Sequence, residues 1–512
     1  MSGKNLPINA FPPGIVRNTS QYATKGRWWD GNQIRWHGGV PAPIGGWYKA
    51  YTAALGASSE PWRVAWSWRD NDFNPWLAVG SADKAMVKLI SDSSAFHDIT
   101  PVDLAWAPGA KSGYGGGAYG AGKYGKDIPD TSSITADNYW TFHAWGEDLV
   151  AVHSLDGRLL KWSPVDPASG LLAEVAAAPA DNILVVVTDE RHVMLMGGAG
   201  NPRRVKWCSQ EDIDDWTATA TNTAGGFDLD THGAIIAAAK VPQGVLVFTD
   251  VDVHLIEYVG VDLGVYARRQ ITDVTGILGP FAYTATPNGL MFAGTHNFWA
   301  FDGGVSPVPC DVRFDVFDRG QLTRPVSMFM GFNEEFQEIW FFYPQLGASE
   351  ADRYVIRGSD GWWSKGSLSR RFWLSPVWQS RPYAGLDADI YEHEIGWLND
   401  GASRNADIYL ESGVLELNNG DRYTKVDRIY HDVVMFDTAT IPETCPYSLT
   451  FKMRRGPTAP EYTYGPITPN NDNGFTTVRF QGRQVVMRVN QLADSGWGLG
   501  EVRARVKEGM GR

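Results

Sequence analysis

The stretch of this sequence most suggestive of chemistry is a glycine- and tyrosine-rich tract, G-A-K-S-G-Y-G-G-G-A-Y-G-A-G-K-Y-G-K, at residues 109–126. Its glycines match the G-x-G-x-x-G spacing of dinucleotide-binding loops twice, from Gly115 and from Gly120. That chemistry requires a strand before the loop and a helix after it, because the helix N-terminus binds the pyrophosphate. Here Pro129 and a polar run follow. The tract also approaches a phosphate loop, but Tyr124 replaces the Ser or Thr that binds Mg²⁺. We therefore predict no nucleotide site.

Metal and acid–base motifs are equally weak in the rest of the chain. The run D-N-D-F-N-P at residues 70–75 resembles the start of a calcium loop, but Pro75 stands where the sharp turn needs glycine. Ser81 stands at the twelfth position of that loop, where a carboxylate is needed. The closest histidines, His143 and His153, have no cysteine nearby. We expect no metal site, no cofactor and no enzyme activity.

Carboxylates gather in the segment D-V-R-F-D-V-F-D at residues 311–318. Strand alternation would place Asp311, Arg313 and Asp315 on one face, which indicates a local ion network. A glycosidase pair stays an alternative, because the partner of a catalytic carboxylate is visible only in three dimensions.

The totals describe an acidic protein rich in aromatic residues and glycine. The chain has 512 residues, with 45 Lys and Arg against 58 Asp and Glu, a net charge of −13, and it contains 22 Trp and 56 Gly. A negative net charge opposes tight binding to nucleic acid, which needs basic residues against the phosphates. Cys208, Cys310 and Cys445 are odd in number and far apart, so we expect three reduced thiols. We expect no signal peptide and no membrane span.

Strands account for nearly the whole sequence, and one unit recurs. The unit is an apolar strand, a turn containing Asp, Asn or Gly, and a second strand that ends in an aromatic residue, as in D-L-V-A-V-H-S-L-D-G-R-L-L-K-W. Its first strands begin near Leu149, Leu184, Val245, Leu290 and Ile339, with gaps of 35, 61, 45 and 49 residues. Four-stranded propeller blades repeat at roughly 40–50 residues. We predict an all-β protein, an irregular β-propeller with an additional smaller C-terminal β domain or extension.

The predicted domain boundaries follow from where this unit stops. Residues 48–400 are assigned to the propeller, with the Gly/Tyr tract as a loop insertion at 109–127. Residues 401–512 contain Pro/Asn-rich turns and alternating strands, which indicates a β domain or strands that return to the propeller. Residues 1–47 are assigned to an N-terminal arm and aromatic hairpin.

The N-terminal hairpin contains the run G-R-W-W-D-G-N-Q-I-R-W-H-G-G, residues 26–39. Asp30-Gly31-Asn32 predicts a turn between two short aromatic strands. We expect its tryptophans to fix the N-terminal segment to the body of the protein or to a neighbouring subunit, and its arginines to pair with carboxylates there. The residues of this aromatic clasp are Arg27, Trp28, Trp29, Arg35, Trp36 and Trp47.

Three separate islands of the sequence resemble one family. The first is the run at residues 14–47, which contains the hairpin run just quoted and ends in I-G-G-W, and the second is the Gly/Tyr tract at 113–125. The third is R-F-Q-G-R-Q-V-V-M-R-V near the C-terminus, with S-G-W-G-L-G-E-V-R after it. Together they resemble the tail nozzle, tail tube or packaged-DNA stabilisation proteins of short-tailed, podovirus-like bacteriophages. The C-terminal family motif comprises Arg479, Gly482, Arg483, Gln484 and Trp497. One departure is Gly498, where Arg is usual in the family.

The resemblance implies a structural virion protein without catalytic residues. Such proteins are propellers with added β domains that assemble as hexameric rings below the head-to-tail adaptor, retain the packaged DNA and form the ejection channel. The implied partners are other copies of the chain, the adaptor, a tail fibre or tailspike protein, and DNA that passes through without specific binding. The implied location is the phage tail, after synthesis in the bacterial host cytoplasm. The candidate channel or gate loop comprises Gly113, Tyr114, Gly117, Tyr119, Gly122 and Tyr124.

Two other functions stay open at this point. A carbohydrate-binding or glycan-active propeller of the tail could stack exposed tryptophans such as Trp362 and Trp363 on sugar rings. An intracellular scaffold propeller would instead associate with host proteins.

Overall fold

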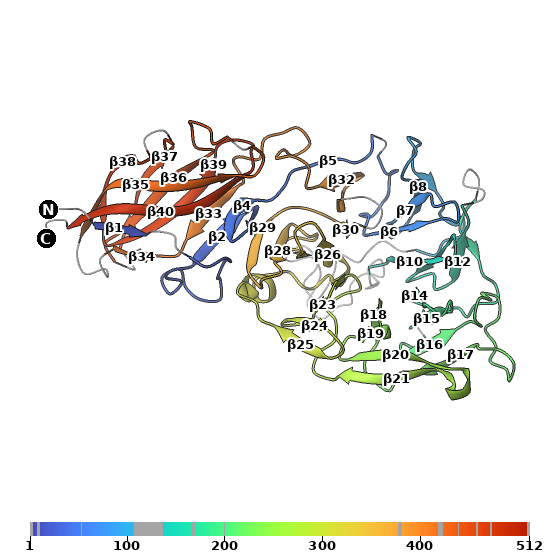
Figure 1. Ribbon diagram of the computed structural model, residues 1–512. Coiled ribbons are helices and arrows are strands. Elements are labelled where there is room, and N and C mark those ends of the chain that lie inside the picture. Colours follow the sequence, from blue (N-terminus) through green and yellow to red (C-terminus); the bar gives the residue numbers. More distant parts are fainter. Residues whose placement is uncertain are drawn as a thin grey trace, which may run out of the picture.

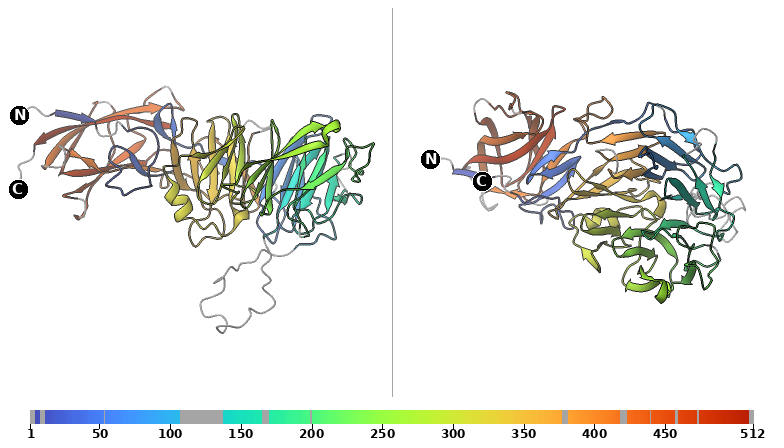
Figure 2. Two further views of the ribbon diagram at one scale, coloured as in Figure 1. Left: turned by 90° about the horizontal axis from the view of Figure 1, so that it is seen from below. Right: turned by 45° about the vertical axis from the view of Figure 1, so that its right-hand side comes forward.

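The protein is almost entirely β-structure and consists of a propeller and a sandwich that lie side by side (Figure 1). The computed structural model describes residues 4–508 except 8–10, 53, 107–136, 165–169, 199, 377–380, 418–422, 439, 457–458 and 472–473. Both termini lie at the far end of the sandwich, away from the propeller (Figures 1 and 2). The prediction of an all-β propeller with a smaller additional β domain is confirmed.

Over the described residues, seven four-stranded antiparallel sheets form the blades of the propeller. Blade one consists of β6 (Val64–Arg69), β7 (Pro75–Gly80), β8 (Ala85–Leu89) and β9 (His97–Asp98). Blade two consists of β10 (Trp140–Trp145), β11 (Asp148–His153), β12 (Leu159–Trp162) and β13 (Ala173–Glu174). Blade three consists of β14 (Leu184–Val187), β15 (Val193–Met196), β16 (Arg204–Trp207) and β17 (Gly225–Asp228). Blade four consists of β18 (Ile235–Val241), β19 (Gly244–Thr249), β20 (Val253–Gly260) and β21 (Val265–Thr272).

Blades five and six also follow in chain order, whereas blade seven includes a strand from the N-terminal region. Blade five consists of β22 (Tyr283–Thr286), β23 (Gly289–Ala293), β24 (Phe298–Phe301) and β25 (Val305–Val308). Blade six consists of β26 (Phe329–Asn333), β27 (Glu338–Tyr343), β28 (Arg353–Arg357) and β29 (Trp363–Ser367). Blade seven consists of β30 (Phe372–Leu374), β31 (Tyr383–Leu386), β32 (Asp389–His393) and β5 (Trp47–Lys49). Short helical turns are η1 (Val261–Leu263), η2 (Phe314–Asp318) and η3 (Pro325–Ser327).

The ring closes between blade seven and blade one. First strands of neighbouring blades pack against one another from β22 through β26, β30, β6, β10 and β14 to β18, and the contact of β30 with β6 joins blade seven to blade one. Strand β5 pairs with β32 in the register Trp47↔His393. A strand from before blade one therefore forms the outer edge of blade seven, which holds the ring shut by hydrogen bonds between residues distant in sequence.

The blades are held together by apolar strands whose every residue is buried. Strand β14 has the sequence LVVV and β15 the sequence VMLM, and all eight side chains are buried. Between blades six and seven the contact is so close that Gly331 in β26 has room for no side chain: a Cβ there would lie 1.9 Å from Trp373. Such strands read as continuous apolar runs and have no alternation that marks their order within a blade.

The sandwich is built from strands of both ends of the chain. Sheet A has the strand order β1 (Lys4–Pro7), β40 (Trp497–Glu508), β35 (Thr424–Met435) and β38 (Thr476–Gly482). Sheet B has the order β2 (Trp28–Asn32), β33 (Tyr409–Ser412), β39 (Gln484–Gln491), β36 (Tyr447–Arg454) and β37 (Tyr462–Ile467), with β34 (Leu415–Glu416) on β39. The hairpin β3 (Ile34–His37) and β4 (Val40–Pro43) lies between the sandwich and the propeller, where β4 contacts β40 and β3 contacts β29.

Two local expectations for the N-terminal region and the acidic segment are wrong. Asp30, Gly31 and Asn32 do not form a turn, because they lie within β2, which pairs with β33 and not with β3. The reversal comes one residue later, at Gln33, whose φ is 56°. Residues 311–318 are not a strand either: they contain the π-helical turn η2.

Candidate functional site

The part of the aromatic clasp around Arg35 lies where the hairpin β3–β4 meets blades six and seven. Arg35, on β3, is 2 % exposed. Its guanidinium donates to both carboxylate oxygens of Glu394, at 2.6 and 3.0 Å, and to Glu338 of β27 at 3.0 Å. The face of the guanidinium stacks on Phe336 at 3.7 Å. One buried charge therefore joins the hairpin to blade six and to the residue that follows β32 in blade seven.

Glu338, the second carboxylate that binds Arg35, lies in an environment that disfavours its charged form. Glu394 already binds Arg35 with two parallel hydrogen bonds, and it also accepts hydrogen bonds from the Asn333 amide and the Gly45 N–H. Glu338 is 1 % exposed and shares the same guanidinium. Burial raises the pKa of Glu338 to about 7, against the opposing attraction of Arg35. The clasp therefore holds a group that changes charge near neutral pH.

Trp47 lies at the closure of the ring among three basic side chains. Its indole N–H donates to Asn399 Oδ1 at 2.5 Å, and its ring stacks on His393 at 5.4 Å. The guanidiniums of Arg370 and Arg404 lie 4.9 and 4.6 Å from its ring. Burial lowers the pKa of Arg370 to about 9 and that of Arg404 to about 10. Cation–π contact with the indole offsets part of the cost of burying these two cations.

The first half of the clasp makes one ion pair with the propeller, from the residue that precedes β2. Arg27 pairs with Asp311 at 3.2 Å, and both side chains are partly exposed. Trp28 is buried and meets Phe11 edge to face, whereas Trp29 is half-buried and lies under the guanidinium of Arg17. These contacts and the Arg35 pairs are within the chain.

The acidic segment forms an ion network, although with different partners from those expected. Asp315, 8 % exposed, binds Arg17 at 3.0 Å, Lys365 at 3.1 Å and Arg319 at 2.6 Å. These cations keep the pKa of Asp315 below its ordinary value despite its burial. Arg313 points elsewhere and donates to the His296 carbonyl and the Asn297 side chain. The sequence predicted a strand here, and the π-helical turn that forms instead gives Asp315 and Arg313 different neighbours.

The tryptophans proposed to stack on sugars are buried. Trp362 is 8 % exposed and packs against Trp36 of the clasp at 5.4 Å, and Trp363 is 2 % exposed. The Trp363 indole N–H donates to the Pro309 carbonyl at 2.9 Å. The expectation that these two rings are available to a glycan is therefore wrong.

Three residues of the C-terminal motif lie where the chain crosses from sheet A to sheet B. Gly482 ends β38, Arg483 bridges the two strands and Gln484 begins β39. Arg479 is exposed on β38. Trp497 is buried at the start of β40, where its N–H donates to Gln491 Oε1 at 3.0 Å and its ring meets Tyr447 at 5.0 Å.

Gly498 occupies a position without room for a side chain. A Cβ there would lie 2.9 Å from Phe436 and 3.0 Å from Val40. The phenyl ring and the valine of β4 thus fill the space into which an arginine at this position would extend.

The candidate gate residues Gly113, Tyr114, Gly117, Tyr119, Gly122 and Tyr124 all lie outside the described residues.

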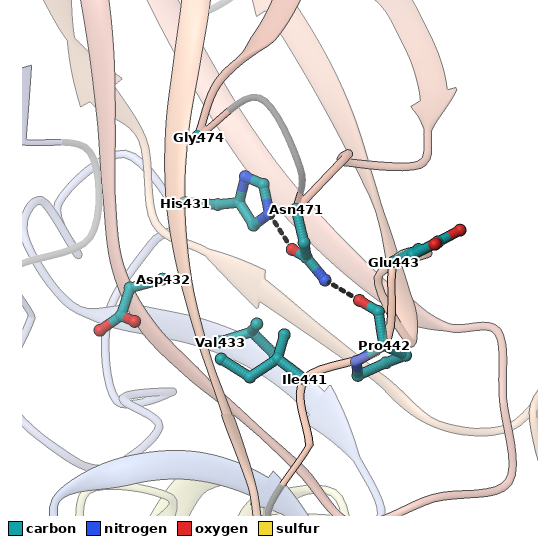
Figure 3. Close-up of a pocket in the computed structure, with 8 residues that line it drawn as sticks. All are labelled: His431, Asp432, Val433, Ile441, Pro442, Glu443, Asn471 and Gly474. Carbon is teal, nitrogen blue, oxygen red and sulfur yellow. Dashed lines mark hydrogen bonds between the residues drawn. The ribbon is translucent and has the colours of Figure 1, made fainter.

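One polar pocket of the sandwich shows no arrangement for acid–base chemistry among its described residues. A pocket of about 310 Å³ in the sandwich is lined by His431, Asp432, Glu443 and Asn471, among others (Figure 3). The His431 ring is hydrogen-bonded to the Asn471 amide at 2.7 Å, and the two carboxylates point away from it (Figure 3). Within the described ranges, no group of three or more His, Cys, Asp or Glu is placed to hold a metal ion.

The two neighbouring histidines are structural as well. His143 packs on Trp66 at 4.8 Å, and the ring of His153 bonds the Ala82 carbonyl at 2.9 Å. Burial lowers the pKa of each to about 4, so both are neutral at pH 7.

No helix in the described part of the chain is long and apolar enough to cross a membrane.

The described residues define a class of protein: a seven-bladed propeller that contacts a β-sandwich through the hairpin β3–β4. No family model matches the chain, and neither does any curated protein. Among solved structures, a streptogramin B lyase is 12 % identical, with a TM-score of 0.40 over 66 % of this chain and 95 % of that one. A virginiamycin B lyase from Staphylococcus aureus is 9 % identical, with a TM-score of 0.34 over 69 % and 94 %. The β-propeller domain of Cps50 (Swd1) from Myceliophteria thermophila is 7 % identical, with a TM-score of 0.38 over 66 % and 97 %. These likenesses carry no argument about function.

Proposed function

We propose that this protein is a structural subunit of a phage tail, which forms a hexameric nozzle ring below the head-to-tail adaptor, retains packaged DNA and serves as the ejection channel. The supporting observation is the aromatic clasp. Residues 28–49 are bound to the sandwich through β2 and to the propeller through β5, and Arg35 secures the intervening hairpin by a buried ion triad. A subunit that bears load in a ring needs its two domains fixed to one another.

The resemblance of the three sequence islands supplies the rest of the proposal. Two of the islands fall on described residues, and both are used for packing: the first forms the clasp and the third forms the crossing between the two sheets. Motifs of this kind preserve the shape of a subunit, and they are expected in a protein whose role is assembly.

The test is imaging of the purified full chain, and of virions that contain it, by electron microscopy with mass measurement of the assembly. Sixfold rings and a density for this protein at the base of the tail are expected. A chain that stays monomeric at high concentration and is absent from virions would contradict the proposal.

A second experiment tests the channel role of the Gly/Tyr tract, which lies outside the described residues. Deletion of residues 113–125 should change DNA retention in the capsid or DNA ejection. Unchanged DNA leakage and infectivity, in virions that contain the shortened protein at normal copy number, would rule out a gate at this tract.

A further inference from the structure

The sandwich differs in charge from the rest of the chain. Residues 401–512 contain 14 Lys and Arg and 13 Asp and Glu, a net charge of +1, so the preceding 400 residues have a net charge of −14. The overall acidity of the protein is therefore a property of the propeller region. Any argument from the total charge about polyanion binding applies to that region and not to the sandwich.

The outer face of sheet A collects basic side chains. Alternate residues of its strands point inward, where Val426, Phe480 and Val506 are buried, and the residues between them point to solvent. The outward basic residues are Lys425 and Arg428 on β35, Arg479 on β38, and Arg503, Arg505 and Lys507 on β40. The acidic residues on the same strands are Asp427, Asp432, Glu501 and the terminal Glu508 of β40, and the side chains of the first three are described.

The carboxylates neutralise only part of this face. Asp427 pairs with Arg505 and Lys507, each at 2.7 Å, and Glu501 pairs with Arg503 at 2.5 Å. Among the described residues, Lys425, Arg428 and Arg479 form no ion pair. Arg428 instead lies over the ring of Phe475 at 4.2 Å. The edge toward β38 therefore carries the uncompensated positive charge.

A pocket continues this basic edge around β38. It has a volume of about 330 Å³ and contains Arg455 and Arg479 together with Tyr423, Tyr462 and Tyr464. Arg479 belongs both to the pocket and to the sheet face, and its backbone N–H donates to the Tyr464 hydroxyl at 3.0 Å. Arg455 forms no ion pair with any described residue. We call this site the basic tyrosine pocket.

The other cations around the pocket are already engaged. Arg454 pairs with Glu461 at 2.6 Å, and Arg483 lies 5.2 Å from the ring of Tyr423. The Nε atom of Arg483 is buried and has no hydrogen-bond partner among the described residues. Arg455 and Arg479 are therefore the two exposed guanidiniums that an incoming anion meets.

We propose that the basic tyrosine pocket and the adjoining face of sheet A bind single-stranded nucleic acid through its backbone phosphates. Guanidiniums bind phosphate oxygens with paired hydrogen bonds, and tyrosine rings stack on unpaired bases without regard to sequence. A row of cations along neighbouring strands suits an extended polyanion better than a compact one. The site stands on the charges and rings of the sandwich, so it does not depend on the ring-forming role proposed above.

The number of uncompensated cations sets the expected salt dependence. Lys425, Arg428, Arg455 and Arg479 are four, and each phosphate that a cation neutralises on a single strand contributes roughly 0.7 to the slope of log affinity against log salt. The slope for the full chain should be about −3. That slope corresponds to a loss of about 60-fold in affinity between 50 and 200 mM salt.

The experiment measures fluorescence anisotropy of a labelled, mixed-sequence single strand titrated with the full chain at several salt concentrations. The test variant is Arg455→Ala/Arg479→Ala, and Arg455→Lys/Arg479→Lys retains the charge. The matched control is Arg268→Ala/Arg269→Ala, which removes two exposed arginines from strand β21 of the propeller. Circular dichroism verifies that all variants are folded.

The test variant should bind at least tenfold more weakly at 50 mM salt and show about half the slope, whereas the lysine variant and the propeller control should stay within about threefold of the parent. Unchanged affinity in the test variant, or an equal loss in the propeller control, would overturn the proposal. Equal or tighter binding of a matched duplex, of heparin or of a polyglutamate peptide would also overturn it, because the tyrosines would then have no role in recognition.

Discussion

The buried ion triad of the clasp gives a quantitative prediction for Arg35→Met. The methionine fills similar volume but leaves Glu338 and Glu394, 1 % and 4 % exposed, without their cation. Removing one partner of a buried ion pair typically costs about 3–5 kcal/mol, because the remaining charge is buried and uncompensated. We expect a loss of that size in the free energy of unfolding. The loss should be smaller at pH 5.5 than at pH 8.5, since burial raises the pKa of Glu338 to about 7 and a proton neutralises that carboxyl group in acid.

The matched control is Arg27→Met, which breaks an ion pair of the same chemistry at the surface. Arg27 and Asp311 have side chains 34 % and 46 % exposed, so solvent screens their attraction and the expected cost is about 0–1 kcal/mol. Urea unfolding followed by tryptophan fluorescence reports both variants, and the Trp340 indole N–H donates to Glu338 of the triad at 3.1 Å. If Arg35→Met were no more destabilising than Arg27→Met, or equally destabilising at both pH values, the assignment of the triad as the link between domains would be refuted.

Three further predictions concern the same junction and the sandwich. Because burial raises the pKa of Glu338 from 4.5 to about 7, its contribution to stability is present below pH 4.5 and up to about 3 kcal/mol is lost as the pH rises through 7. Urea midpoints of the parent and Glu338→Gln at pH 5 and pH 8 should therefore differ by a pH-dependent amount, and a constant difference would contradict the shift. Trp47→Ala should cost about 3–5 kcal/mol and expose blade seven to proteolysis, whereas Tyr48→Ala on the same strand should cost less. Gly498→Ala should cost about 1–3 kcal/mol through overpacking against Phe436. A double-mutant cycle with Phe436→Ala should recover part of that loss, and purely additive effects would exclude the contact.

The fold class was within reach of the sequence because its signals are local. Apolar strands and Asp, Asn or Gly turns are each encoded by a few adjacent residues. The order of strands within a blade is not local, and the error at Leu184 shows why. Leu184 begins the first strand of blade three, whereas Leu149, Val245, Leu290 and Ile339 lie in second strands. Both β14 and β15 are continuous apolar runs, so nothing in their composition separates them.

Correct assignment of the second strands restores an even repeat. From blade two to blade seven they begin at residues 148, 193, 244, 289, 338 and 383, with gaps of 45, 51, 45, 49 and 45. The uneven spacing among these blades was therefore a consequence of one misassigned strand, whereas the step of 73 residues from the start of β7 to the start of β11 is long because the Gly/Tyr tract lies within it.

The sequence predicted the aromatic and basic residues of the clasp but not the carboxylates that bind them. Tryptophans and arginines crowded between glycines mark the clasp, but their partners Glu338 and Glu394 follow about 300 and 360 residues later. Glu338 opens the buried strand E-I-W-F-F-Y, where a lone carboxylate among apolar residues was the available signal of an ionic partner. The participation of Asp30 and Gly31 in β2 was not accessible, because their strand partner, β33, comes from the far end of the chain.

The interleaving of the two ends of the chain sets the order in which a nascent protein can fold. Lys4 pairs with Val506, and Trp28 pairs with Ser412. At a synthesis rate of about 5–20 residues per second, the first strand waits about 25–100 s for its partner. The propeller, whose ring closes with β32, can be complete while the sandwich still lacks β40. The basic sandwich is therefore the last domain to be completed during translation. A chain that stops before Trp497 contains a closed propeller attached to an unfinished sandwich.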